Sequence, residues 1–158
     1  MKSKEWLDRQ NRDFYVKKAK KIGYVSRSAY KILEIEKKFK LINNSKNILE
    51  LGSAPGGWSQ VVFELKDTVK MYAFDLLDMK FKHPNMKFIK ENFLTYDYSK
   101  IPHKFDLILC LEVLEHIDNF KKTLQQITTL VKPKGTLVLS TINRNLKSLI
   151  FMKNLNFF

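Results

Sequence analysis

The sequence predicts an α/β fold, built on one doubly wound, mainly parallel sheet of about five strands. Three observations predict it. Short apolar segments alternate with segments of helical periodicity through residues 47–141. The run 105–111 is apolar almost throughout, as in a parallel strand covered on both faces. A glycine-rich turn at 52–57 joins the first strand to the first helix of this alternation, where such sheets hold a ligand.

The elements follow in a simple order. Residues 1–25 form a polar, basic arm with weak helical periodicity, and Ser26 or Ser28 could cap a helix that runs to about Phe39. Strands are expected at 47–52, 70–75, 87–90, 105–111 and 136–141. Helices are expected at about 57–66 and 119–131, the second stopped by Lys132-Pro133-Lys134-Gly135. The chain is long enough for one domain with a real core.

Positive charge is concentrated ahead of the glycine-rich turn. The net charge is +13, and residues 1–46 hold 14 of the 29 Lys and Arg but 5 of the 16 Asp and Glu. Aromatic residues are interleaved with these cations, as suits a phosphate backbone with bases that can stack. The sequence therefore predicts RNA as a partner. The alternative is a composition rich in Lys and Asn throughout, but such drift would spread the charge evenly.

Several other classes of protein are disfavoured. No apolar stretch is long enough to cross a bilayer, and residues 1–20 lack the apolar segment of a signal peptide. Cys110 is the single cysteine, which excludes an internal disulfide and suits the reducing cytoplasm; it lies in an apolar run and is expected to pack. The three histidines are scattered, so no metal site is predicted. We expect a cytoplasmic monomer without a membrane span.

The segment 50–60, Glu-Leu-Gly-Ser-Ala-Pro-Gly-Gly-Trp-Ser-Gln, indicates strand, turn and helix. Its glycines permit a tight turn close to a ligand, and the helix start offers free N–H groups. The spacing departs from the dinucleotide fingerprint and resembles motif I of S-adenosylmethionine (SAM) methyltransferases, whose domain has a Rossmann-like fold. Asp75 ends the second strand, where a carboxylate can accept hydrogen bonds from ribose hydroxyls. Asn92 ends the third strand, where this fold contacts adenine.

Residues 2–109 resemble the FtsJ/RrmJ-type ribosomal RNA ribose 2′-O-methyltransferases. The matching pieces are Ser3–Arg12, Tyr15–Ala19, Gly23–Lys31, the motif through Gln60, Asp75–Leu77 and Phe105–Ile108. The resemblance implies that SAM binds at Gly52, Gly56, Gly57, Trp58, Asp75, Asn92 and Leu111. It implies Lys31 as a catalytic residue and Arg27 and Tyr30 as substrate-binding residues. On this interpretation residues 1–46 are a basic arm with a helix, and 47–158 form the SAM-binding part of a single domain.

The resemblance weakens after the fourth strand. Leu111 stands where the family has a catalytic Asp, Ser140 or Thr141 where it has a second Lys, and Asn92 where an Asp contacts adenine. The segments 110–117, 130–135 and 140–144 instead resemble UbiG-type ubiquinone-biosynthesis O-methyltransferases. That resemblance implies Glu115 and His116 beside a substrate pocket, with metal ligation by Glu115 conceivable; alternatively both only begin a helix.

The sequence also predicts an incomplete sheet. Both resembled families continue beyond the fifth strand into an antiparallel pair, whereas this sequence ends in the apolar segment 149–158. The fifth strand would then be an exposed edge, unless the terminal apolar residues cover it. We therefore expect a chimeric or truncated member in which the later strands are missing.

Three functions remain open from the sequence. The favoured one is SAM-dependent methylation of RNA, most simply of a ribosomal RNA ribose. The second is O-methylation of a small phenol, a ubiquinone precursor, which would not need the basic arm. The third is a SAM- or RNA-binding module without activity, because the catalytic positions of the family are replaced.

Overall fold

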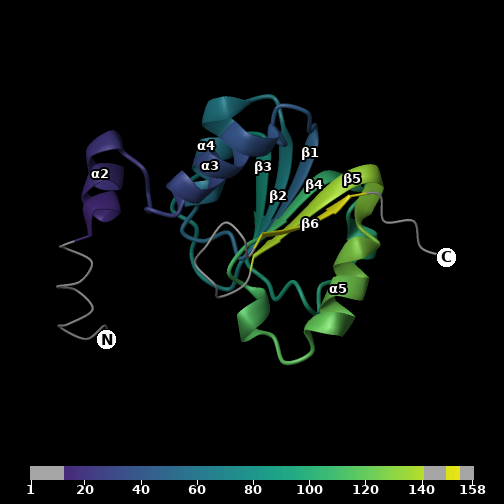
Figure 1. Ribbon diagram of the computed structural model, residues 1–158. Coiled ribbons are helices and arrows are strands. Elements are labelled where there is room, and N and C mark those ends of the chain that lie inside the picture. The colour runs from purple at the N-terminus through teal and green to yellow at the C-terminus, as the bar shows by residue number, and fades with distance from the viewer. Residues whose placement is uncertain (1–12, 141–148, 154–158) are drawn as a thin grey trace.

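The computed structural model describes residues 13–140 and 149–153 (Figure 1). Its helices are α2 (Phe14–Ile22), α3 (Ala29–Phe39), α4 (Gly57–Leu65) and α5 (Phe120–Thr128), with 3-10 turns at Tyr98–Lys100 and Leu114–His116. Its strands are β1 (Asn47–Leu51), β2 (Lys70–Phe74), β3 (Met86–Ile89), β4 (Phe105–Cys110), β5 (Val131–Ser140) and β6 (Leu149–Lys153). Among the described helices, none has the length and apolar character needed to cross a membrane.

The strands form one sheet in the order β3-β2-β1-β4-β5-β6. The first five are parallel, and β6 is antiparallel to β5. The predicted doubly wound α/β fold is confirmed. Strand order reverses between β1 and β4, whose last residues Leu51 and Cys110 are partners in the sheet. In open parallel sheets a ligand binds outside the carboxyl ends of the strands at this reversal.

Both faces of the sheet are covered, with α3 and α4 on one and α5 on the other (Figure 1). Alternate residues of β4 serve the two faces: Leu107 and Leu109 join one apolar cluster, Ile108 and Cys110 the other. Cys110 is fully buried, and burial raises the pKa of its thiol to about 12. It therefore packs as an apolar residue, as the sequence predicts.

The second half of the sheet differs from the prediction in two ways. The expected helix 119–131 ends at Thr128, and Val131 already pairs with Phe105 as the start of β5. The pairing of β4 with β5 shifts register between Phe105 and Leu107, and this irregularity accommodates Pro133. The Lys-Pro-Lys-Gly segment therefore lies within a strand. The second correction concerns the edge: β6 covers β5 from Thr136 to Ser140, so a strand expected to be missing is present.

The basic arm contains a helix of its own, which stands to one side of the sheet (Figure 1). The carboxylate of Asp13 caps α2 by accepting hydrogen bonds from the N–H groups of Tyr15 (2.8 Å) and Val16 (3.2 Å). Gly23 ends it with a φ of 94°, which L-residues disfavour. Ser28 is the residue before α3, although its side chain makes no capping bond. Residues 1–12, with the matching piece 3–12, lie outside the described residues.

The turn after β1 is determined by Gly52. Its φ is 75°, and its N–H donates to the Phe74 carbonyl of β2 at 2.9 Å. A Cβ built on Gly52 would lie 2.4 Å from Cγ2 of Val113, in the loop after β4. This position thus needs glycine both for its backbone conformation and for the close approach of a neighbouring loop.

We therefore predict that Gly52→Ala destabilises the protein by roughly 2 kcal/mol more than Gly23→Ala. Both changes place an L-residue at positive φ, but nothing lies within 4 Å of a Cβ on Gly23. Urea unfolding followed by circular dichroism measures the difference. Adding Val113→Ala to Gly52→Ala should recover part of the loss. Equal losses for the two single variants would show that the contact with Val113 is unimportant.

Candidate functional site

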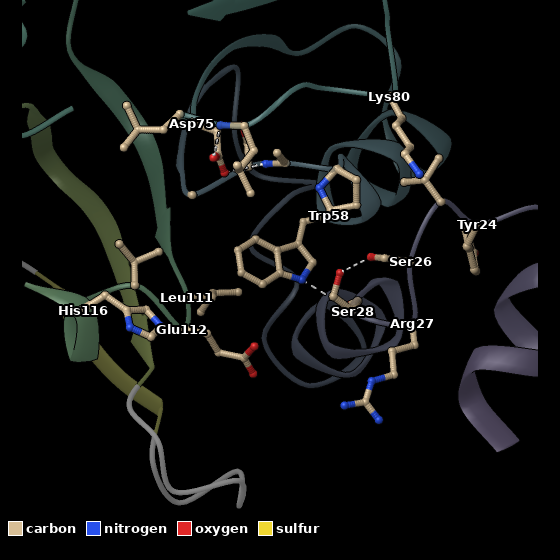
Figure 2. Close-up of a pocket in the computed structure, with 18 of the residues that line it drawn as sticks. Tyr24, Ser26, Arg27, Ser28, Trp58, Asp75, Lys80, Leu111, Glu112 and His116 are labelled. Atoms are coloured by element: carbon tan, nitrogen blue, oxygen red, sulfur yellow. Dashed lines mark hydrogen bonds between the residues drawn. The ribbon is translucent and has the colours of Figure 1, made fainter. Parts of the chain in front are cut away.

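A cavity of about 920 Å³ lies at the carboxyl ends of β1, β2 and β4, where the strand order reverses (Figure 2). Of the residues that the resemblance to FtsJ/RrmJ-type enzymes predicted as functional, six line it: Arg27, Gly52, Trp58, Asp75, Asn92 and Leu111. These residues come from segments far apart in the chain, and the sheet topology brings them together. Gly56, Gly57, Tyr30 and Lys31 are not among its lining residues.

Trp58 lies between the strand ends and the start of α3 (Figure 2). Its indole Nε1 donates to the carbonyl of Ser28 at 3.0 Å, and only 6% of the residue is exposed. This bond ties the first turn of α4 to the segment before α3. The ring therefore forms a fixed wall, with its position held by both packing and a hydrogen bond.

Asp75 places a carboxylate at the end of β2. One oxygen, Oδ2, accepts from the Ala54 N–H, and Oδ1 accepts from the Leu77 N–H, each at 2.8 Å. These two bonds fix the carboxylate against the turn after β1. A carboxylate has about four acceptor sites, so Asp75 retains capacity for hydroxyl groups of a ligand.

Glu50 supports this turn from inside the sheet. Its Oε2 accepts from the Ser59 hydroxyl at 2.6 Å, which joins β1 to α4, and its Oε1 has no hydrogen-bond partner among the described residues. Burial raises the pKa of Glu50 to about 8, and the charge of nearby Asp75 adds to the shift. Glu50 does not line the cavity and is a structural residue that sequence reasoning did not single out.

The remaining cofactor candidates differ in how they meet the cavity. Asn92 lines it, with Oδ1 accepting from the Leu94 N–H at 3.0 Å. Leu111 is 1% exposed and packs in the core, so it can supply only an apolar wall. Gly56 and Gly57 are close-packed beneath the turn: added Cβ atoms would lie 2.6 Å from Phe81 Cβ and 2.2 Å from Ser26 Oγ. Their role in the structure is to allow α4 to begin there.

The two predicted substrate-binding residues lie on the side of α2. Arg27 forms an ion pair with Asp13, and its guanidinium points away from Trp58 (Figure 2). The Tyr30 ring contacts Tyr15 and Tyr24, with ring centroids 5.4 and 5.9 Å apart, and the ammonium of Lys18 lies 5.3 Å from its centre. These contacts hold α2 against α3, and they place cations and aromatic rings next to the cavity.

Lys31 does not line the cavity, but it contacts a lining residue that sequence reasoning missed. Its ammonium donates to Oε1 of Glu112 at 2.8 Å and to the Ser140 hydroxyl at 3.4 Å. The Glu112 N–H donates to the same hydroxyl at 2.9 Å. Glu112 lines the cavity and has a φ of 55°, a left-handed conformation that costs a residue with a side chain roughly 1–2 kcal/mol. Pairs 81 and 109 residues apart leave no signal in the sequence.

The loop after β4 contains Glu115 and His116, which the sequence analysis placed beside a substrate pocket, and part of this loop lines the cavity. His116 lines it, and Oε2 of Glu115 is buried without a hydrogen-bond partner in the described part of the chain. Both belong to the short turn Leu114–His116 and not to a longer helix. Within residues 13–140 no group of three His, Cys, Asp or Glu side chains is placed to hold a metal ion.

The cavity fits an adenosine-type cofactor such as SAM. The carboxylate of Asp75 is fixed at a strand end and can accept from two ribose hydroxyls. Leu76 and Phe93 add apolar surface suitable for a purine, and Gly52 lets the backbone of the turn approach closely. The lining of the cavity thus combines a few polar groups, such as the Asp75 carboxylate, with apolar walls.

Two known proteins with related sequences are ribosomal RNA methyltransferases. Ribosomal RNA large subunit methyltransferase E of Coxiella burnetii (strain Dugway 5J108-111) is 53% identical over 79 residues, which cover 49% of this chain and 37% of that protein. The enzyme of the same name from Bradyrhizobium diazoefficiens is 48% identical over 83 residues, covering 50% and 36%. The matched segment therefore spans little more than a third of the length of these curated relatives.

Solved structures extend the likeness to the fold. A ribosomal RNA methyltransferase from Plasmodium falciparum superposes with a TM-score of 0.63 at 22% identity, covering 78% of this chain and 81% of that chain. Coclaurine N-methyltransferase bound to N-methylheliamine and SAH gives 0.60 at 16%, covering 72% and 35%. The family model described as FtsJ-like methyltransferase matches residues 24–156, most of the chain. The chain belongs to the FtsJ-like methyltransferase family.

Proposed function

We propose that this protein transfers the methyl group of SAM to ribosomal RNA, at a ribose 2′-hydroxyl. The observation that carries the proposal is the cavity at the strand reversal, which Asp75, Trp58 and Glu112 line and beside which Lys31 pairs with Glu112. Membership in the FtsJ-like family supports methyl transfer. The names of the similar proteins support ribosomal RNA as the substrate. A cytoplasmic location and a monomeric state stay predictions.

In this proposal the cofactor lies across the ends of β1 and β2. Asp75 accepts hydrogen bonds from the ribose, and Asn92 lies beside the adenine. Gly52 and Trp58 contact the methionine end, while Gly56 and Gly57 allow the turn and Leu111 supplies apolar surface. When bound, SAM supplies an electrophilic methyl carbon on a sulfonium. The contribution of the protein is to hold a nucleophilic oxygen in line with that carbon.

The surface around α2 supports RNA as the substrate. Lys17, Lys18, Lys20 and Lys21 lie on this helix, and Lys20 also lines the cavity. Phe14 and Tyr15 are exposed beside them, at 68% and 51%. Cations that meet phosphates and exposed rings that stack on bases are the two elements of single-strand recognition. The proposed path of the RNA therefore runs from α2, past Arg27 and Tyr30, to the cavity.

A small phenol is the second candidate substrate, favoured by one observation. His116, which the sequence analysis predicts beside a substrate pocket, lines the cavity together with Glu112. The phenol proposal gives no role to the cations of α2. The two substrates can therefore be compared directly.

The proposal predicts methyl transfer to RNA and not to a catechol. Radiolabelled SAM is incubated with the folded chain and either ribosomal RNA transcribed in vitro or catechol, and label in each product is counted. Incorporation into RNA, at a nucleotide that becomes resistant to alkaline cleavage, is expected. Incorporation into catechol alone would establish the second candidate. Absence of incorporation in both would contradict methyl transfer and favour a binding module without activity.

RNA binding should depend steeply on salt, because cations of α2 displace counterions from the phosphates. Replacing Lys20 and Lys21 by Gln should reduce the slope of log K against log salt concentration by about 1.4, at 0.7 per phosphate contact. Lys121→Gln with Lys122→Gln on α5 is the matched control, since this exposed pair lies over the opposite face of the sheet. Fluorescence anisotropy with labelled single-stranded RNA gives the slopes. An equal effect of the two pairs would contradict a binding surface on α2.

A further inference from the structure

Glu112 is the carboxylate placed closest to Lys31 at the rim of the cavity. It follows β4 directly, so it stands at the strand reversal, and its side chain is 58% exposed. Figure 2 shows the carboxylate below the indole of Trp58, on the side of the cavity that faces Ser28. It thus combines access from solvent with a fixed cationic partner.

We propose that Glu112 is a catalytic residue: it accepts the proton of the hydroxyl group that is methylated, while Lys31 holds its carboxylate in position. This inference rests on the proposed function and assigns its proton acceptor. Leu111, which stands where the resembled family has a catalytic Asp, is buried, and its side chain has no atom that could accept a proton. Glu112 lies one residue further along the chain and faces the cavity.

The contacts of Lys31 suit a hydrogen-bond donor. Its ammonium group has three N–H donors and no lone pair, and one of these donors is used by the Glu112 carboxylate at 2.8 Å. Lys31 also donates to Ser140 at 3.4 Å, which leaves one N–H for the substrate. Lys31 is therefore a positioning residue that can also contact an RNA oxygen.

The other carboxylates around the cavity are less suitable. Both oxygens of Asp75 accept backbone N–H groups, and the proposal assigns the residue to the ribose of the cofactor. Glu91 directly precedes Asn92 after β3, at the side assigned to the adenine. Glu112, after β4, is the carboxylate on the side of α3 where the RNA is proposed to enter.

The backbone at Glu112 supports a functional placement. A Glu at φ 55° is unusual, and it is held there by the bond from its N–H to the hydroxyl of fully buried Ser140. Residues held in disfavoured conformations cluster at active sites, where the surrounding structure fixes them. Here the conformation turns the chain after β4 so that the side chain of residue 112 leaves the core that receives Leu111.

The proposed step balances as follows. The substrate oxygen forms a bond to the methyl carbon, and the bond from that carbon to sulfur breaks with its electron pair going to sulfur. The proton of the hydroxyl passes to the Glu112 carboxylate, which becomes a neutral acid and later releases it to water. One positive charge on sulfur and one negative charge on the carboxylate disappear together, so no other reactant is needed.

The test compares Glu112→Gln with Glu34→Gln. Glu34 is an exposed carboxylate on α3, the helix that carries Lys31, and its replacement makes the same change of charge away from the cavity. We expect Glu112→Gln to lower single-turnover methyl transfer to ribosomal RNA by about 100-fold or more, the usual size of a general-base contribution. Affinity for S-adenosylhomocysteine, measured by calorimetry, should stay within twofold, which also shows that the variant folds.

Glu112→Asp should retain more activity than Glu112→Gln, because Asp keeps the carboxylate and tolerates the left-handed conformation. A second readout needs no cofactor. Acetylation of Lys31 in the free protein, followed by mass spectrometry of its peptide, should become several-fold faster in Glu112→Gln and stay unchanged in Glu34→Gln.

Two results would overturn the role of Glu112 alone: an active wild type with Glu112→Gln within threefold of it, or Lys31 acetylation that does not respond to the variant. A wild type that methylates neither RNA nor catechol would overturn the proposed function, and the assignment of Glu112 with it. The two failures are therefore distinguishable.

Discussion

The site depends on one constraint, the close packing of the turn after β1 against the loop after β4. Gly52 has positive φ and leaves no room for a Cβ beside Val113. Because the two loops touch, the residues that follow β4 are held at a fixed distance from the turn that would carry the cofactor. Asp75 strengthens the arrangement through its bond to the Ala54 N–H. The turn that would hold the cofactor and the loop that carries Glu112 are thus packed together at one edge of the sheet.

Much of this corner could be predicted from local sequence. Glycine spacing after the first strand and a polar residue after the second and the third predict the location of the cavity, because parallel strands end at the same edge. Trp58, Asp75 and Asn92 were predicted as cofactor residues and line one cavity. The alternation of helices and strands predicted the fold class, and the charge of residues 1–46 predicted a basic arm, in which α2 lies.

The rest depends on contacts between distant residues. Nothing in the sequence joins Lys31 to Glu112 and Ser140, since their approach follows from the order of β1, β4 and β5. The start of β5 was misjudged because Pro133 and Gly135 usually mark a turn, whereas here they occupy an irregular strand start. The sequence left open whether the edge of β5 is exposed or covered by the terminal apolar residues, and backbone pairing with β6 covers it. In each case pairing between distant residues decided the structure, and such pairing leaves little trace in the local sequence.

The central claim is that the cavity binds an adenosine cofactor through Asp75. Calorimetric titration of S-adenosylhomocysteine into the wild type, Asp75→Ala and Asp78→Ala tests it most directly. Asp78 is an exposed carboxylate paired with Lys90 and lies three residues beyond Asp75, so it controls for charge. The account predicts binding to the wild type and to Asp78→Ala with equal affinity, and a loss of roughly 1–3 kcal/mol in Asp75→Ala. A folded wild type that binds no S-adenosylhomocysteine, or equal affinity in all three proteins, would contradict it.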